Sequence, residues 1–391
     1  MSKSKITELI PRLSALCVFR GLLEKPLIRA LYDFATTTDR IDAYSRFVYE
    51  IYRTGGDLTA SVRQMVFEDE NVYVTSLAAG RAINPCIKAA AERELDTLSH
   101  LASLSESDFS DLLGGASVAG FSSSSVNLLA EYEARICNIG KHGYGMFASH
   151  GMFRLSDSDD RRIEPIVSAD GISVTSFTGY ENERERVIAN TQAFVDGKPA
   201  ANVLLYGDAG TGKSSTVKAV ANRFFEEGVR LIELRKDQMS FLPYIMEKIS
   251  GNPLKFIIFI DDLSFNRNDD SFSMLKAALE GSASAKASNA VIYATSNRRH
   301  IVRECFDDRE GTDVHRNDTM QELLSLSARF GLAIRYEKPN KELYLRIVRE
   351  LAEKKGIVKD VTALEIEAEA FALNRGHRSP RCAEQFIDSL L

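Results

Sequence analysis

The chain has 391 residues, of which 44% are hydrophobic and 27% charged, and 49 Lys and Arg against 55 Asp and Glu give a net charge of −6. The apolar content excludes a disordered chain, and the length excludes a single small module and indicates two or three domains. The mild acidity argues against a protein that coats nucleic acid by massed phosphate neutralisation, so nucleic-acid binding stays open but unsupported.

The first part of the chain predicts helices, because apolar residues recur at helical spacing in 6–16 and 27–34. The serine run 122–125 predicts a loop. We find no metal-ligand set, no nucleophile with a base and no basic aromatic face here. We therefore expect 1–155 to be a mostly helical N-terminal domain that binds an unknown protein client or mediates oligomerisation. No segment near the N-terminus is apolar enough for a signal or membrane span, so we expect no membrane association and a cytoplasmic location.

The cysteines form no metal-binding pattern. Five are spread along the chain, at positions 17, 86, 137, 305 and 382. None lies at zinc-ligand spacing from another Cys or a His. We expect buried thiols, since free cysteines are commonly interior.

A charged stretch with a proline, 156–176, is typical of a linker. Beyond it, short β-branched runs alternate with helical patterns, and these runs are 202–206, 229–234, 256–260, 290–296 and 331–336. Near-continuous apolar strands separated by helices predict a parallel sheet covered on both faces. We place an α/β core at 177–337 and a helical C-terminal subdomain at 338–391.

Residues 207–214, GDAGTGKS, fit the phosphate-loop pattern G-x-x-x-x-G-K-[ST] between a predicted strand and a predicted helix. Glycines let backbone N–H groups face a polyphosphate, and a helix N-terminus adds partial positive charge. The candidate nucleotide-binding residues are Gly207, Asp208, Ala209, Gly210, Thr211, Gly212, Lys213, Ser214 and Ser215. Lys213 would contact the β and γ oxygens, and the Ser214 hydroxyl would coordinate Mg²⁺. No N-K-x-D motif follows, so ATP is the expected nucleotide.

Two carboxylates, Asp261 and Asp262, end the apolar run 256–260. The carboxyl end of a strand is where ligand chemistry lies in an open α/β sheet. Side chains at adjacent strand positions point opposite ways. Asp261 would hold Mg²⁺, in our interpretation through water, and Asp262 would orient or deprotonate the attacking water. The alternative is a strand followed by a solvated turn.

The segments LLYGDAGTGKSS, FIIFIDDLSF, YATSNRRH and SLSARFGL resemble the motifs of AAA+ ATPases, in the family order and over just over half of the chain. Within that superfamily the chain is similar to a bacterial group of unknown function that resembles the clade of replication initiators and helicase loaders. The resemblance implies a P-loop AAA+ core with a five-stranded parallel sheet, a C-terminal helical lid, and an active site completed by a neighbouring subunit of a homo-oligomer.

The resemblance also implies residue roles. Asn297 matches the sensor 1 residue, which would fix the water or the γ-phosphate. Arg329 matches the arginine finger that a neighbouring subunit supplies. Arg381 fits the sensor 2 arginine of the lid, and Arg378 lies too close in the sequence to be separated from it. Residues 177–180 loosely match the segment that packs near adenine.

The sequence therefore predicts an ATPase that uses ATP and Mg²⁺ to remodel or load a macromolecular partner. The alternative is a nucleotide-gated oligomeric scaffold or switch with little or no turnover. Many AAA+ members have Glu where this chain has Asp262, and the shorter side chain is consistent with slow turnover. A metabolic kinase is a weaker interpretation, because it would not need Arg329 in trans.

Overall fold

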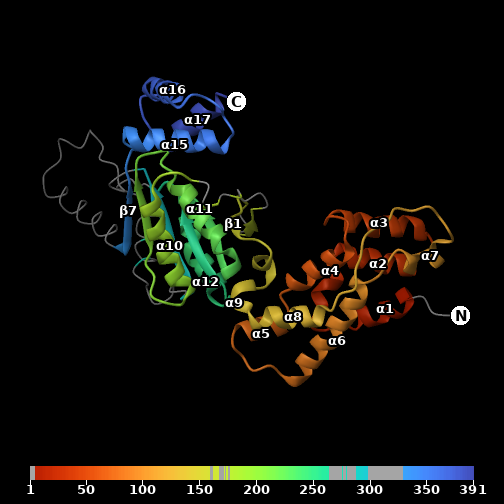
Figure 1. Ribbon diagram of the computed structural model, residues 1–391. Coiled ribbons are helices and arrows are strands. Elements are labelled where there is room, and N and C mark those ends of the chain that lie inside the picture. The colour runs from red at the N-terminus through yellow and green to blue at the C-terminus, as the bar shows by residue number, and fades with distance from the viewer. Residues whose placement is uncertain are drawn as a thin grey trace. The chain divides into compact units, whose positions relative to one another are not determined.

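The computed structural model describes residues 5–158, 162–166, 171, 173–174, 177–263, 275, 279, 288–297 and 329–391. The chain divides into two compact units, Met1–Ser149 and His150–Leu391. Figure 1 colours the first unit red to yellow and the second yellow to blue. Among the described residues, no helix has the length and apolar character needed to cross a membrane.

The first unit is helical, as predicted, and a single apolar core holds it together. Its described helices are α1 (Lys5–Ser14), α2 (Pro26–Thr36), α3 (Arg40–Tyr52), α4 (Leu58–Phe67), α5 (Val72–Ala78), α6 (Pro85–Ala102), α7 (Ser107–Leu113), α8 (Leu128–Cys137) and α9 (Ile139–His142), with 3₁₀ turns at Arg20–Glu24 and Gly145–Ala148. Side chains that accept backbone N–H groups cap several of these helices, namely Asp39, Asp57, Asn71, Asn84 and Asn127.

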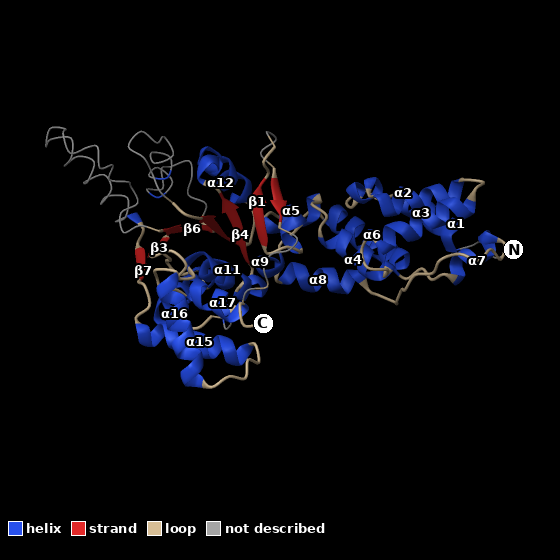
Figure 2. Cartoon of the chain, turned by 90° about the horizontal axis from the view of Figure 1, so that it is seen from above, coloured by secondary structure: helices blue, strands red, loops and turns tan. Residues whose placement is uncertain are grey.

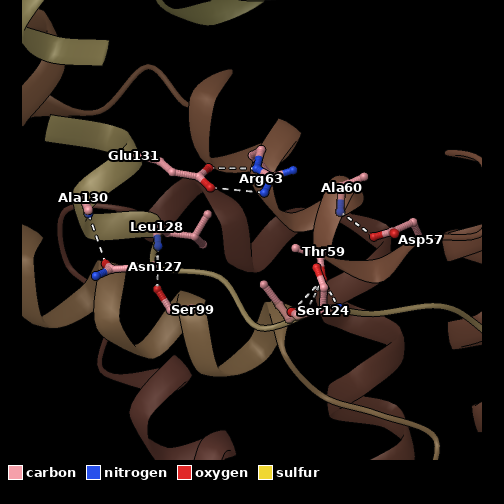
Figure 3. Close-up of polar contacts among 11 residues, drawn as sticks. Asp57, Thr59, Ala60, Arg63, Ser99, Ser124, Asn127, Leu128, Ala130 and Glu131 are labelled. Carbon is pink, nitrogen blue, oxygen red and sulfur yellow. Dashed lines mark hydrogen bonds and ion pairs between the residues drawn. The ribbon is translucent and has the colours of Figure 1, made fainter. Parts of the chain in front are cut away.

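The serine run lies in the loop between α7 and α8, as predicted, and polar contacts fasten that loop to the helices (Figure 3). The buried Thr59 hydroxyl accepts the Ser124 N–H at 2.8 Å and lies 2.8 Å from the Ala102 carbonyl oxygen, to which it donates. Arg63 forms a bidentate ion pair with Glu131 at 2.8 and 3.1 Å, which joins α4 to α8. These polar side chains thus hold the loop and the helices of the first unit together.

The prediction of buried thiols is wrong for Cys17, Cys86 and Cys137, which are exposed. Cys86 lies in the first turn of α6 and Cys137 ends α8, and neither side chain belongs to the apolar core of this unit. Cys382 is buried as expected, and position 305 lies outside the described residues.

The second unit contains a mostly parallel sheet with strand order β2-β1-β4-β5-β6-β3-β7. The strands are β1 (Met152–Leu155), β2 (Ile163–Pro165), β3 (Val203–Gly207), β4 (Val229–Leu234), β5 (Lys255–Ile260), β6 (Ala290–Ser296) and β7 (Leu332–Tyr336). The five predicted runs form β3 to β7, all pairing in parallel. This confirms the α/β fold class.

The sheet is larger than the five strands expected, because β1 pairs in parallel with β4 and β2 pairs antiparallel with β1. We placed 152–155 in the N-terminal domain and 163–165 in the linker. Phe153 is fully buried and stands opposite Ile232 of β4, so this segment extends the sheet. A strand of four residues gives too short a pattern to recognise.

Helices cover both faces of the sheet. On one face, α10 (Glu181–Val195) and α11 (Lys213–Arg223) share an apolar core with alternate residues of the strands. On the other face lies α12 (Leu242–Ser250), across the strands from α11 in Figure 2. After β7 come α15 (Lys341–Lys354), α16 (Val361–Asn374) and α17 (Pro380–Asp388), which have an apolar core of their own. The C-terminal part is therefore helical, as predicted.

Candidate functional site

The carboxyl ends of three neighbouring strands form the candidate site. Strand β6 lies between β3 and β5, and all three run in parallel. The predicted phosphate loop follows β3, the two acidic residues follow β5, and Asn297 follows β6. Parallel strands bring the residues after them to one edge of the sheet, which is where α/β folds bind ligands.

Glycines shape the loop between β3 and α11. Gly207 has a φ of 130°, and a Cβ there would lie 2.1 Å from the Tyr336 carbonyl oxygen, so only glycine fits beside β7. Gly212, with a φ of 88°, directly precedes α11, which begins at Lys213. The Thr211 hydroxyl donates to the Asp208 carbonyl at 2.9 Å. The predicted loop therefore ends at a helix N-terminus.

The Lys213 ammonium lies inside the loop. Its Nζ donates to the carbonyl oxygens of Gly207, at 3.1 Å, and Asp208, at 2.7 Å. Only 5% of this residue is exposed, and burial lowers the pKa of its ammonium, against the nearby carboxylates of Asp208, Asp261 and Asp262. The loop thus holds a buried cation whose present partners are backbone oxygens.

Asp261 accepts hydrogen bonds from two hydroxyl groups, one at the start of α11 and one on the neighbouring strand β6. Its Oδ1 accepts from Ser214 Oγ at 2.6 Å and from the hydroxyl of Thr295, which is 2% exposed. Two hard oxygen donors from the phosphate loop and the strand end therefore lie together, which fits Mg²⁺ bound by one or two protein oxygens and water. Within the described residues, no cluster of three or more His, Cys, Asp or Glu side chains offers a fuller protein cage.

Asp262 adopts a left-handed backbone conformation, with a φ of 50°. Among residues other than glycine, Asp and Asn tolerate this region best, so the conformation favours Asp over Glu here. Its N–H donates to Thr295 Oγ1 at 3.0 Å, and its Oδ1 accepts from Asn297 Nδ2 at 2.7 Å. The structure thus brings Asn297 into direct contact with the second carboxylate.

Thr295 is the site residue that we missed from the sequence. It lies on β6, opposite Leu205 of β3, and its hydroxyl bonds both to the Asp261 side chain and to the Asp262 backbone. Its position two residues before Asn297 gave only a weak indication of a role in the site, because its contacts with Asp261 and Asp262 depend on the register between the strands.

For the ATPase that the sequence predicts, with Asp261 as the expected Mg²⁺ ligand, we expect Thr295→Val to raise the Mg²⁺ concentration for half-maximal phosphate release by about tenfold, because support of a metal ligand is commonly worth 10- to 100-fold in affinity. Thr191→Val is the matched control, since it removes a fully buried hydroxyl from α10, where Thr191 bonds to the Val187 carbonyl and the Tyr293 hydroxyl. Titrations of both purified variants with Mg²⁺ check this. Equal Mg²⁺ dependence in the two variants would contradict the assignment.

The C-terminal helices meet the phosphate loop at Arg381. Its backbone N–H donates to the Gly210 carbonyl at 3.3 Å, and a Cβ on Gly210 would lie 3.3 Å from the Arg381 Cβ. Arg378 instead makes a bidentate pair with Glu369 at 2.7 and 2.9 Å, and this hydrogen bonding raises the pKa of Arg378. Of the two arginines, Arg381 is the one placed at the loop.

A small cavity lies between the phosphate loop, residues before α10 and the start of α17. Its lining residues are Phe177, Thr178, Tyr180, Arg184, Gly210, Thr211, Gly212, Ser215, Thr216, Pro380, Arg381 and Glu384. The segment expected near adenine therefore borders the loop. Arg184 donates to the backbone carbonyls of Phe177 and Gly179, which orders that segment.

Arg329 lies away from this edge. It is half-buried just before β7, and the next glycine, Gly331, packs against Ala201 at the start of β3. The phosphate loop follows the opposite ends of these strands. The five residues of β7 span about 16 Å at about 3.3 Å per residue. Arg329 is thus remote from the phosphate loop of its own chain.

A family model described as "Protein of unknown function (DUF815)" matches residues 148–391, more than half of the chain. No curated protein sequence matches. Among solved structures, the Thermotoga maritima RuvB Holliday junction branch migration motor is 17% identical, with 56% of this chain and 64% of that chain covered and a TM-score of 0.38. The FIGL-1 AAA domain in complex with ADP is 18% identical, with 47% and 61% covered and a TM-score of 0.33. The chain thus spans less than two thirds of either structure, and we assign no activity from them.

Proposed function

The chain belongs to the DUF815 family of proteins of unknown function. For this chain we propose that it binds ATP with Mg²⁺ at residues 207–215 and hydrolyses it as an AAA+ ATPase. The observation that carries the proposal is the hydrogen bond of 2.6 Å between Ser214 and Asp261. It joins the phosphate loop to the acidic strand end and leaves the Asp262–Asn297 pair beside them. Phosphate binding, metal binding and activation of water thus have residues at one edge.

The residues divide the work by their chemistry. Backbone N–H groups of the loop and the start of α11 face the phosphates, and the Lys213 ammonium moves from the loop carbonyls to the β and γ oxygens. Ser214 and Asp261 would hold Mg²⁺, and the bound ion would neutralise charge on the phosphate oxygens. Asp262 accepts a proton from the attacking water, and Asn297 orients both through its amide.

Two arginines complete the proposed site. Arg381 lies in the first turn of α17, where its backbone N–H contacts Gly210, and its side chain contacts the bound nucleotide from the C-terminal helices. Arg329 serves the site of a neighbouring subunit, since it lies at the far end of β7 from its own loop. A homo-oligomer follows from this division, with the subunits joined head to tail.

The partner is a macromolecule that the ATPase remodels or loads, and the helical first unit is the part that binds it. The described side chains of that unit hold helices and loops together, and we assign them no chemistry. A nucleotide-gated scaffold with little turnover is the second candidate, favoured by one observation, the hydrogen bond that occupies Asp262 Oδ1 with the Asn297 amide.

Calorimetry with ATP and Mg²⁺, followed by phosphate-release assays, tests the proposal. We expect saturable binding and Mg²⁺-dependent release by the wild type. Asp262→Asn should bind ATP, because Asn keeps an oxygen for Asn297 and suits the left-handed backbone, but it should release phosphate at least about a hundredfold more slowly. Binding without release by the wild type would favour the scaffold. No binding at all would overturn both functions.

A further inference from the structure

We propose that Asp208 is a positioning residue that couples the phosphate loop to the hinge between the sheet and the C-terminal helices. Asp208 is the first residue after β3, and the hinge is the segment 337–340, between β7 and α15. The inference rests on the proposed ATP binding at the loop. The inference is that ATP binding at the phosphate loop shifts the hinge, and the proposed hydrolysis does not require such a shift.

Asp208 makes one hydrogen bond to the end of β7 and one to the hinge. Its backbone N–H donates to the Tyr336 carbonyl at 3.0 Å, and its Oδ2 accepts the Lys338 N–H at 3.0 Å. The Lys338 ammonium lies 4.0 Å from Oδ1, with both side chains largely exposed, so this ion pair adds little. The carboxylate therefore holds the hinge mainly through the Lys338 backbone.

Tyr180 contacts the same stretch of chain from another segment, at Tyr336 and Glu337. Its hydroxyl donates to the Glu337 carbonyl at 2.6 Å, and its ring stacks on Tyr336 with centroids 5.2 Å apart. Tyr180 also lines the cavity beside the phosphate loop. Residues 336–338 are thus fixed by two segments that both border the proposed nucleotide site.

The carbonyl of Asp208 provides the link to the nucleotide. It accepts from Lys213 Nζ at 2.7 Å and from the Thr211 hydroxyl at 2.9 Å. When Lys213 turns to phosphate oxygens, the peptide group after Asp208 loses its cationic partner and can reorient. The side chain of the same residue then transmits the change to the Lys338 N–H. A proline at position 208 could make neither the backbone bond to Tyr336 nor the side-chain bond to Lys338.

Hydrogen exchange measured by mass spectrometry tests the coupling, with ATP and Mg²⁺ as the probe. Without nucleotide, Asp208→Ala should speed exchange at the Lys338 amide by about tenfold, because a hydrogen bond to a charged acceptor is lost. Asp208→Asn keeps an acceptor oxygen and should restore protection, and Lys338→Ala, which keeps the N–H, should match the wild type. Unchanged exchange within β5 (255–260) shows that each variant is folded.

The nucleotide arm uses ATP concentrations that saturate each variant. In the wild type, ATP with Mg²⁺ should slow exchange in 337–354, and in Asp208→Ala this slowing should be lost while the loop itself stays protected. Tyr180→Phe, which removes the other bond to the hinge, should weaken the response as well and serves if Asp208→Ala does not fold. Wild-type exchange at Lys338 in Asp208→Ala, or an intact ATP response of 337–354, would overturn the coupling. If the wild type does not bind ATP, both the proposed function and the coupling are overturned. This holds even if exchange without nucleotide confirms the contact between Asp208 and the Lys338 N–H.

Discussion

Replacement of Lys213 by Met should abolish measurable ATP hydrolysis and weaken ATP binding by about a hundredfold or more, because a positioned cation on transferring phosphates is worth at least two orders of magnitude. Without nucleotide, the Lys213 Nζ donates to the backbone carbonyls of Gly207 and Asp208, at 3.1 and 2.7 Å. It therefore exchanges neutral acceptors for charged phosphate oxygens on binding, a gain that Met cannot supply.

The same substitution should leave the fold intact. Burial lowers the pKa of Lys213, so its charge costs free energy in the folded state, and Met fills similar space without that cost. We expect a melting temperature close to that of the wild type. Lys218→Met is the matched control on the same helix, since Lys218 pairs with Glu233 at 3.1 Å on the neighbouring strand and should be dispensable for hydrolysis. Full hydrolysis by Lys213→Met would show that the loop does not act on the nucleotide.

The parts of the fold that the sequence predicted are those encoded by continuous local patterns. The apolar runs of β3 to β6 are mostly buried, and β7, at the edge of the sheet, alternates buried and exposed residues, so each run can be recognised without knowledge of its neighbours. The glycine pattern of 207–212 is also a local signal, because Gly207, Gly210 and Gly212 each adopt a positive φ that favours glycine. The proximity of Ser214 and Asp261 then follows from parallel strands alone.

The parts that escaped prediction depend on pairing between distant segments. Thr295 supports Asp261 only through the register of β6 with its neighbours, and β1 is recognisable as a strand only beside β4. Arg378 and Arg381 lie near the start of one helix, and they are distinguished by two long-range contacts, the pair of Arg378 with Glu369 and the contact of Arg381 with Gly210. The hinge contacts join residues near 180, 208 and 338, which no local pattern connects.

Arg329→Ala is the second substitution with a large expected effect. An arginine that stabilises transition-state charge from a neighbouring subunit is worth about 10³ to 10⁵ in rate, so this variant should be nearly inactive while it still binds ATP. The length of β7 separates Arg329 from the phosphate loop of its own chain, so the expected loss of hydrolysis comes from the site of a neighbouring subunit. Loss of hydrolysis alone would not distinguish a shared site from a folding defect, so the decisive measurement mixes two inactive variants.

Arg329→Ala and Asp262→Asn each lack one half of a shared site, and Asp262→Asn retains the residues that bind ATP and so remains able to assemble. In an equal mixture, a site is active where Asp262 of an Arg329→Ala chain meets Arg329 of an Asp262→Asn chain. Random head-to-tail assembly gives this arrangement at about a quarter of the interfaces. Phosphate release should therefore recover to about a quarter of the wild-type rate after subunit exchange, although neither variant alone is active. An inactive mixture whose subunits demonstrably co-assemble would contradict a site shared between chains. Hydrolysis by Arg329→Ala alone would show that Arg329 has no part in the chemistry.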